Sequence, residues 1–174
     1  MSNLVDLRTA IRDIPDFPKK GILFKDITTL LKDPHAFRET VHQMTEACRG
    51  FGATHIVAIE SRGYMFGGAV AYNLGLGFVP VRKPGKLPAE TFSEDYELEY
   101  GTNTLELHRD ALGRGDRALI VDDLIATGGS SLATARLVER GGAEVSGFGF
   151  VVELSFLNGR DQLSGYPVVS LITY

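Results

Sequence analysis

The alternation of short apolar runs with helical periodicity predicts an α/β protein. Runs such as 55–59 and 117–121 are mostly apolar, which is typical of parallel strands buried on both faces. Apolar positions three and four residues apart predict helices between these runs. The predicted strands cover 22–24, 55–59, 77–81, 117–121, 144–152 and 168–173, and the main predicted helices cover 34–49, 63–74 and 129–140. This order of strands and helices favours a parallel sheet flanked by helices.

Two regions depart from this rhythm. Residues 4–13 have the pattern of a short amphipathic helix that ends near Pro15. Residues 83–96 contain two prolines and mixed charges without apolar periodicity, which is typical of a long loop or lid. A hairpin of strands 96–99 and 104–107, with Gly101 in its turn, is expected next.

Composition narrows the class of protein. The chain has 174 residues, enough for one domain with a sizeable core, and its net charge is −4. An acidic chain argues against nucleic acid as the main partner. No apolar run approaches the roughly 20 residues that span a bilayer, so we expect no membrane contact. Cys48 is the single cysteine and continues the helical spacing of Val41 and Met44, which predicts a core thiol in a reducing cytoplasm.

The stretch 118–131 carries the strongest chemical signal. Its apolar strand is followed by Asp122 and Asp123, at the strand end where open α/β sheets bind ligands. Thr127 to Ser131 then offer backbone N–H groups and hydroxyls at a helix N-terminus, which suits an anion. An ordinary capped turn also explains Gly-Gly-Ser. Two adjacent carboxylates, however, repel each other unless a partner neutralises them.

This stretch resembles the phosphoribosyl-diphosphate (PRPP) motif of the type I phosphoribosyltransferases. Further segments narrow the resemblance to the adenine-specific members, and they occur in the family's order along the chain. These segments are 17–28, 60–64, 82–88 and 98–101. The resemblance therefore covers nearly the whole chain.

The resemblance implies a fold and a reaction. The fold is one domain over 1–174 with a parallel α/β core, a small hood mainly over about 1–32 and a mobile loop over about 83–101. The reaction transfers the 5-phosphoribosyl group from PRPP to adenine and gives AMP and pyrophosphate, a step of purine salvage. The resemblance also implies a homodimer, and Mg²⁺ that PRPP and water hold in place of a cage of protein ligands.

The resemblance also assigns the substrate-binding residues. Those for the 5-phosphate are Ala126, Thr127, Gly128, Gly129 and Ser130, and those for the ribose are Asp122 and Asp123. Those for pyrophosphate are Ser61, Arg62, Arg82, Lys83 and Lys86. Those for adenine are Leu23, Phe24 and Lys25. Many relatives carry Arg at the position of Lys25. Lysine lacks the planar fork of arginine, so the expectation there rests on the backbone.

Glu99 is the residue to which the resemblance gives proton transfer. Adenine reacts through N9 and must lose a proton, which a carboxylate near N7 can accept. Arg62, Asp122 and Asp123 complete the expected catalytic set, and Tyr100 joins the substrate-binding residues. From the residues alone, a hairpin position that faces water is the favoured interpretation of Glu99.

Other interpretations fit parts of the sequence. Taken alone, the turn 60–63 fits a capped helix start, and the basic residues 82–86 fit a solvated cluster. A phosphoribosyltransferase for guanine or xanthine shares the PRPP motif but is disfavoured by 17–28 and 98–101. A regulator that senses PRPP typically adds a DNA-binding module, and no basic helix for one is present. A P-loop nucleotidase needs Gly-x-x-x-x-Gly-Lys-Ser/Thr, which the sequence lacks.

Overall fold

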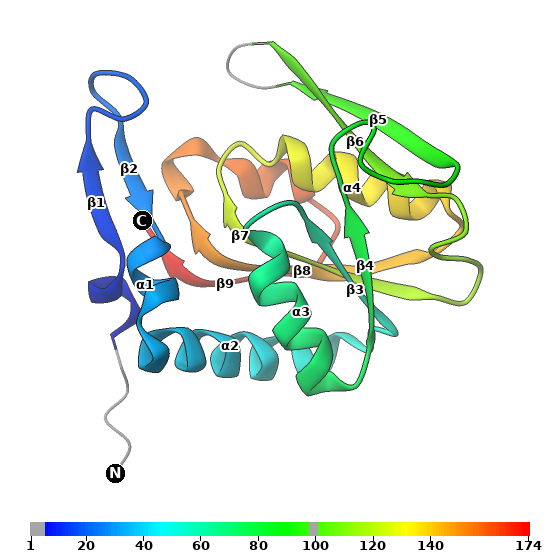
Figure 1. Cartoon of the computed structure of the whole chain (residues 1–174), viewed down its shortest axis with the longest axis horizontal. Helices are drawn as coiled ribbons and strands as arrows, with labels where there is room; N and C mark the ends of the chain where they lie inside the picture. Colours follow the sequence, from blue (N-terminus) through cyan, green and yellow to red (C-terminus); the bar gives the residue numbers. More distant parts are fainter. Residues whose placement is uncertain (1–5, 98–100) are drawn as a thin grey trace. The chain divides into compact units, whose positions relative to one another are not determined.

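The computed structural model describes residues 6–97 and 101–174 (Figure 1). The chain divides after Gln43 into two units, residues 1–43 and 44–174. Helix α2 (Pro34–Cys48) begins in the first unit and ends in the second. Its start is as predicted, because the Asp33 carboxylate accepts hydrogen bonds from the backbone N–H groups of His35 and Ala36.

The first unit differs from its prediction at the N-terminus. In place of a helix over 4–13, a short 3-10 helix η1 (Leu7–Ala10) is followed by strand β1 (Arg12–Pro15). This strand pairs antiparallel with β2 (Leu23–Asp26), and the short helix α1 (Thr28–Lys32) follows. The pairing with β2 satisfies the backbone of Arg12–Pro15, which explains why helical periodicity was a poor guide there.

The second unit is built on a sheet of five parallel strands in the order β4-β3-β7-β8-β9. The strands are β3 (His55–Ile59), β4 (Gly77–Val81), β7 (Arg117–Ile125), β8 (Glu144–Glu153) and β9 (Val168–Thr173). The parallel sheet and its central strand are therefore confirmed. The helical segments are η2 (Arg49–Phe51), α3 (Gly63–Leu74), α4 (Gly129–Arg140), η3 (Ser155–Leu157) and η4 (Gly159–Leu163).

Alternate side chains of the strands cover the two faces of this sheet. On β3, Val57 and Ile59 belong to the core cluster that contains the apolar side chains of α4. Ala58 faces α3, because a Cβ atom at Gly67 would lie 2.7 Å from the Ala58 Cβ. Helices α3 and α4 thus cover opposite faces of the sheet, as Figure 1 shows.

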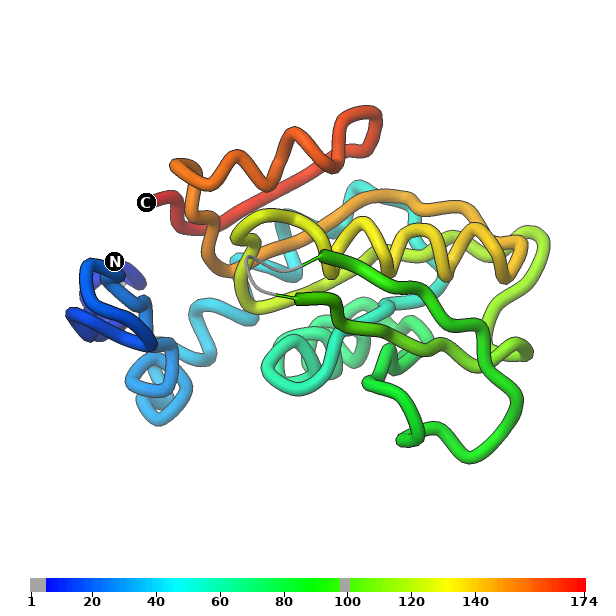
Figure 2. Tube along the Cα trace, turned by 90° about the horizontal axis from the view of Figure 1, so that it is seen from above, coloured from blue at the N-terminus to red at the C-terminus, as the bar shows by residue number. Residues whose placement is uncertain are grey.

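A hairpin of β5 (Thr91–Glu97) and β6 (Thr102–His108) lies beside α4 (Figure 2). The predicted loop over 83–96 is thus partly strand, and β5 begins at Thr91 rather than at residue 96. The Glu94 carboxylate explains this difference, since it pairs with Arg136 at 3.2 Å and Arg140 at 2.7 Å. The two arginines of α4 hold β5 in place although the strand is polar. It lacks the alternation of apolar residues from which strands are predicted.

Candidate active site

A cavity of about 520 Å³ opens at the carboxyl ends of β3 and β7. The motifs predicted to bind one sugar phosphate come together in its lining. The lining residues are Ile59, Glu60, Ser61, Arg62, Lys83, Tyr96, Glu97, Asp122, Asp123, Leu124, Ile125, Ala126, Thr127, Gly128, Gly129, Ser130 and Ser131. This position, at the carboxyl edge of a parallel sheet, is where α/β proteins bind ligands.

Asp122 and Asp123 lie inside β7 rather than beyond its end. The strand continues to Ile125, which corrects the predicted end at residue 121. The Asp122 carboxylate accepts a hydrogen bond from the Asp123 backbone N–H at 2.9 Å. Its Oδ1 also lies so close to α3 that a Cβ atom at Gly63 would be only 2.6 Å away.

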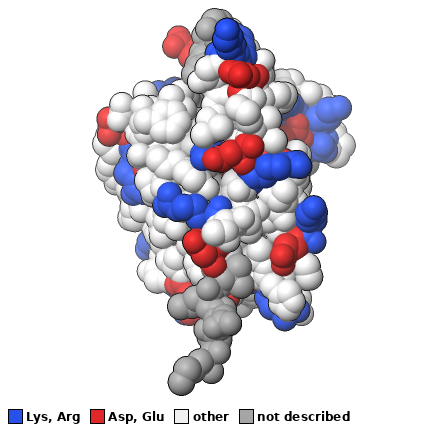
Figure 3. Space-filling view, turned by 90° about the vertical axis from the view of Figure 1, so that its left-hand side faces the viewer, with Lys and Arg blue, Asp and Glu red and all other residues white. Residues whose placement is uncertain are grey.

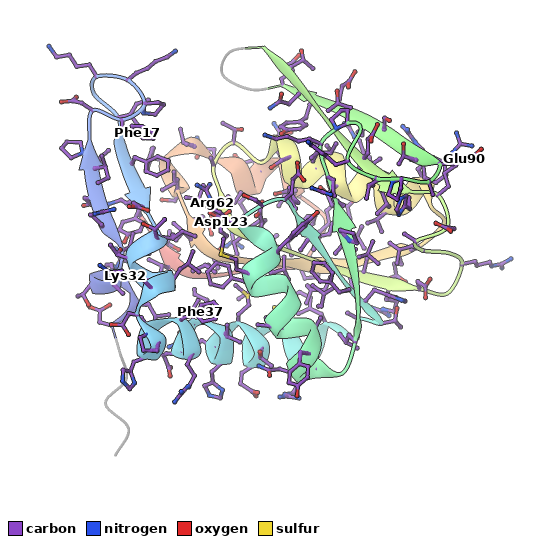
Figure 4. The ribbon with its side chains drawn as sticks, in the orientation of Figure 1. Phe17, Lys32, Phe37, Arg62, Glu90 and Asp123 are labelled. Carbon is purple, nitrogen blue, oxygen red and sulfur yellow. The ribbon has the colours of Figure 1, made fainter. Side chains whose placement is uncertain are left out.

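Arg62 is the partner that the adjacent acids require. Its Nε atom lies 2.7 Å from Oδ2 of Asp123, and the two side chains meet in Figure 4. The sequence analysis assigned Arg62 to pyrophosphate and Asp123 to ribose and missed this ion pair. Residues far apart in the chain carry no local signal of such a contact.

Burial dominates the electrostatics of the acid pair. Both carboxyl groups are almost fully buried. Burial, together with the neighbouring charge of Asp123, raises the pKa of Asp122 well above its ordinary value. Burial also raises the pKa of Asp123, against the opposing effect of the Arg62 guanidinium. The cavity floor therefore holds one carboxyl that favours its neutral form and one that is paired with a cation.

The loop between β7 and α4 forms one wall of the cavity. Gly128, at the N-cap of α4, has φ +87°, a left-handed conformation that favours glycine. Its N-cap position has no side-chain hydrogen bond, so the first-turn N–H groups of α4 are not capped from within the helix start. All five residues predicted for the 5-phosphate, 126–130, line the cavity.

Glu60 organises the basic residues at the opposite wall. Its carboxylate lies 2.8 Å from Arg82 Nε and accepts a hydrogen bond from the Lys83 backbone N–H at 3.1 Å. Burial opposes ionisation, but the hydrogen bonds from Arg82 and Lys83 lower the pKa of Glu60 below its ordinary value. The Arg82 guanidinium also donates to the carbonyl of Lys86. Of Arg82, Lys83 and Lys86, which were predicted to assist with pyrophosphate, Lys83 lines the cavity and the other two do not.

Among the lining residues to which the sequence motifs gave no role are Glu60, Tyr96 and Glu97. Glu60 belonged to a recognised motif without a function of its own, and its charge partner is visible only in the fold. Tyr96 and Glu97 lie at the end of β5, and a Cβ atom at Gly129 would be 3.0 Å from the Glu97 carbonyl oxygen. The sequence predicted a hairpin in this region but did not predict that the end of β5 lies against α4.

The residues predicted to bind adenine lie on β2 in the first unit. Lys25 Nζ lies 2.7 Å from Asp13 Oδ1 on β1. The ring of Phe24 packs edge-on against that of Phe17, with 5.1 Å between centroids. Leu23 pairs with Pro15 in the same two strands. Glu99 and Tyr100, predicted for proton transfer and substrate binding, lie outside the described residues.

Two further findings bear on ligands and surroundings. Within residues 6–97 and 101–174, no group of three or more His, Cys, Asp or Glu side chains is arranged to hold a metal ion. None of the helices in this described part is both long and apolar enough for a membrane span. On the face drawn in Figure 3, Lys and Arg are interspersed with Asp and Glu.

Comparison with known proteins places this architecture in a family. The model of the phosphoribosyl transferase domain matches residues 28–168. The adenine phosphoribosyltransferase of a Synechococcus species is 59% identical over 170 residues, which cover 98% of this chain and 99% of that protein. The adenine phosphoribosyltransferase of Carboxydothermus hydrogenoformans is 58% identical over 170 residues, with 98% and 100% covered.

Solved structures agree with the sequences. Adenine phosphoribosyltransferase from Thermoanaerobacter pseudethanolicus has a TM-score of 0.95 and 55% identity, with 98% of this chain and 99% of that chain covered. The Saccharomyces cerevisiae protein, solved with adenine and an imino-altritol bisphosphate, has a TM-score of 0.89 and 42% identity, with 97% of each chain covered. The chain therefore belongs to the adenine phosphoribosyltransferase family of phosphoribosyl transferase domain proteins.

Proposed function

We propose that this protein transfers the 5-phosphoribosyl group of PRPP to N9 of adenine and releases AMP and pyrophosphate. The observation that carries this proposal is that one cavity brings together a buried acid pair, a helix start without a side-chain cap, and the basic side chains of Arg62 and Lys83. These groups match the three parts of PRPP, which are a ribose, a 5-phosphate and a pyrophosphate. Such a salvage reaction needs positioning and electrostatic stabilisation more than covalent chemistry.

The 5-phosphate binds the loop from Ala126 to Ser130. The backbone N–H groups at the start of α4 donate to its oxygens, and the positive end of the helix dipole favours its charge. The Thr127 and Ser130 hydroxyls add donors. The left-handed Gly128 lets the backbone turn closely around the phosphate.

Asp122 and Asp123 bind the ribose hydroxyls. As these hydroxyls approach, they replace part of the Arg62 contact with Asp123, and the guanidinium turns to the pyrophosphate. Lys83 and the turn at Ser61 supply further donors to the leaving group. Arg82 and Lys86 act from the layer behind Lys83, since they do not line the cavity.

The donor set of the cavity fits Mg²⁺ that arrives with PRPP. Two adjacent carboxylates, Asp122 and Asp123, are oxygen donors for a hydrated cation, and Mg²⁺ characteristically keeps waters and substrate phosphates as ligands. When bound, the metal neutralises charge that develops on the pyrophosphate. Asp122 and Asp123 are the residues that would hold its water shell.

Adenine binds the hood segment of the first unit that contains Leu23, Phe24 and Lys25. Backbone groups of Leu23 and Lys25 contact the edge of the base, and Phe24 packs on its face. Glu99 accepts the proton from the base, and Tyr100 contacts the substrate. The loop that includes residues 98–101 closes over the reaction and excludes water from the ribosyl cation. The family membership supports these assignments.

Steady-state assays with four bases test this function. We expect AMP to form from labelled adenine and PRPP, with a strong dependence on added Mg²⁺. Hypoxanthine, guanine and xanthine should turn over more slowly, because a site built for an amino group leaves polar groups unpaired when an oxo base binds. Faster turnover of an oxopurine would make this a phosphoribosyltransferase for another base. Tight PRPP binding without turnover of any base would favour a PRPP sensor.

We also infer a homodimer in the cytoplasm. Three exposed apolar side chains of α3 and β4, here called the α3 face, support the dimer, and they are Met65, Tyr72 and Phe78. Tyr72 is 88% exposed, and Phe78 of β4 packs against Tyr64 of α3. Large exposed apolar patches commonly mark protein interfaces. The single, buried cysteine supports a reducing compartment.

A further inference from the structure

The segment between β8 and β9 packs directly behind the loop that leads into α4. In Figures 1 and 2 this orange and red segment lies beside the yellow loop. Strand β8 ends at Glu153, and Leu154 donates its backbone N–H to the carbonyl of Ile125, the last residue of β7, at 3.0 Å. The two segments therefore leave the sheet together.

Two glycines form the contact between these segments. A Cβ atom at Gly159 would overlap the carbonyl oxygen of Ala126 and lie 3.0 Å from the Gly128 nitrogen. A Cβ atom at Gly128 would in turn overlap the carbonyl oxygen of Gly159 and lie 3.1 Å from the Gln162 Cβ. Both contacts are with backbone, which cannot move aside as the end of a side chain can. The path of the 126–128 backbone is therefore set by Gly159.

An ion pair between the exposed Arg160 and the buried Glu153 fixes Gly159 in place. The next residue, Arg160, binds the Glu153 carboxylate through two hydrogen bonds, of 3.0 Å from Nε and 2.5 Å from Nη2. It also donates to the Val168 carbonyl at 3.0 Å and to Ser170 at 3.3 Å. These hydrogen bonds lower the pKa of Glu153 below its ordinary value. Arg160 thus ties the segment to the ends of β8 and β9.

We propose that Gly159 is a positioning residue for the 5-phosphate, anchored by the Arg160–Glu153 pair. It does not line the cavity. It acts through the backbone of Ala126 to Gly128, whose N–H groups must converge on one phosphoryl group. This inference rests on the proposed function of the loop, because it assigns a cause to the geometry of that site.

Calorimetric titration with ribose 5-phosphate and with pyrophosphate tests the inference. The two ligands occupy different walls of the cavity, so a fault in the loop should affect only the first. In Gly159→Ala we expect the Kd of ribose 5-phosphate to rise on the order of tenfold to a hundredfold, since a misplacement of about 1 Å has this scale of effect. The Kd of pyrophosphate should stay within about twofold. The KM for PRPP should rise with the Kd of ribose 5-phosphate.

Gly113→Ala is the matched control, because a Cβ atom at Gly113 meets no atom within 4 Å. It should leave both titrations unchanged. A second variant, Arg160→Lys, keeps the charge but loses the two-pronged contact, and it should show the same selective loss in weaker form. It carries the test if Gly159→Ala does not fold. Equal loss of both ligands, or no loss of either, in the folded variants would overturn the inference. Wild-type protein that binds no ribose 5-phosphate would instead refute the proposed function.

Discussion

At the scale of single residues, the buried acid pair works against stability and in favour of binding. Asp122 sits beside Asp123, and Arg62 forms an ion pair with Asp123. Burial disfavours the ionised form of both carboxyl groups, and a cationic ribosyl group or a metal would favour it by supplying positive charge. We therefore expect this pair to cost folding free energy until substrate binds.

Asp122→Asn tests this cost. Because the pKa of Asp122 is raised in the folded protein, the folded state binds more protons than the unfolded chain above about pH 4, and stability falls as pH rises through that window. Asn can still accept the Asp123 N–H and carries no charge. We expect the midpoint of thermal unfolding at pH 7 to rise by about 2–4 °C, for about 1 kcal/mol.

The control for this measurement is Asp110→Asn, at an exposed position. It should leave the midpoint unchanged. Because the pKa of Asp122 is raised, the gain in the unfolding midpoint should shrink as the pH is lowered from 7 towards 4. A lower midpoint for Asp122→Asn at pH 7 would show that the charged form stabilises the fold.

Glu99→Gln separates proton transfer from binding. If Glu99 accepts the proton of adenine, the amide should lower kcat about a hundredfold or more, while the KM for PRPP changes little. Steady-state and single-turnover kinetics measure both quantities. Equal loss in kcat and in PRPP affinity would assign Glu99 to binding or structure.

At the scale of elements, the hairpin of β5 and β6 depends on one carboxylate. Glu94 is mostly buried and receives both Arg136 and Arg140 from α4. Through this clamp, the strand end at Tyr96 and Glu97 stays at the cavity wall. The clamp therefore holds the end of β5 beside α4.

Glu94→Gln should loosen this clamp. Its arginine partners are about half exposed, so the loss is on the order of 1 kcal/mol, which corresponds to about fivefold faster amide exchange in Thr91–Glu97. Amides of α3 should not change. The matched control is Glu90→Gln, since Glu90 is exposed and lies 3.8 Å from its partner Arg109. Unchanged exchange in β5 would mean that strand pairing alone holds the hairpin.

The sequence predicted most elements because their apolar spacing is regular. Helices α3 and α4 and strands β3 and β4 agree with their predicted bounds. The end of β7 was too short because Asp122 and Asp123 look like a solvent-facing turn unless Arg62 is known to meet them. Strand β5 was missed because its polar residue Glu94 forms ion pairs with charged side chains of α4, and such pairs leave no apolar pattern in the sequence. The pattern of apolar and polar positions therefore could not predict contacts between charged residues that are far apart in the chain.

For the candidate site, the motifs predicted well which segments meet. The turn at 61–62, the acid pair and the loop 126–130 all line one cavity. The motifs could not predict the residues that do not bind ligand but contact the binding segments. Glu60 holds Arg82, and Gly159 holds Ala126, through contacts that only the fold creates.

At the scale of the whole molecule, the α3 face predicts how two copies meet. Tyr72→Glu places a charge on the most exposed side chain of this surface and should weaken the dimer by about thirtyfold, which corresponds to about 2 kcal/mol for an aromatic interface residue. Sedimentation equilibrium measures the dissociation constant. The control is Phe156→Glu, which puts the same charge on an exposed aromatic away from the face. A dimer unaffected by Tyr72→Glu would move the interface elsewhere.

The sulfur of Cys48 offers a built-in reporter of how often this protein opens. This sulfur packs against β8, since a Cβ atom at Gly149 would lie 2.9 Å from it. Burial raises the pKa of the Cys48 thiol to about 12. At pH 8 only about one molecule in ten thousand carries the thiolate, so a maleimide reacts at a useful rate only when the end of α2 detaches from the sheet. The rate of alkylation in rising urea should therefore follow unfolding of the second unit, without any engineered label.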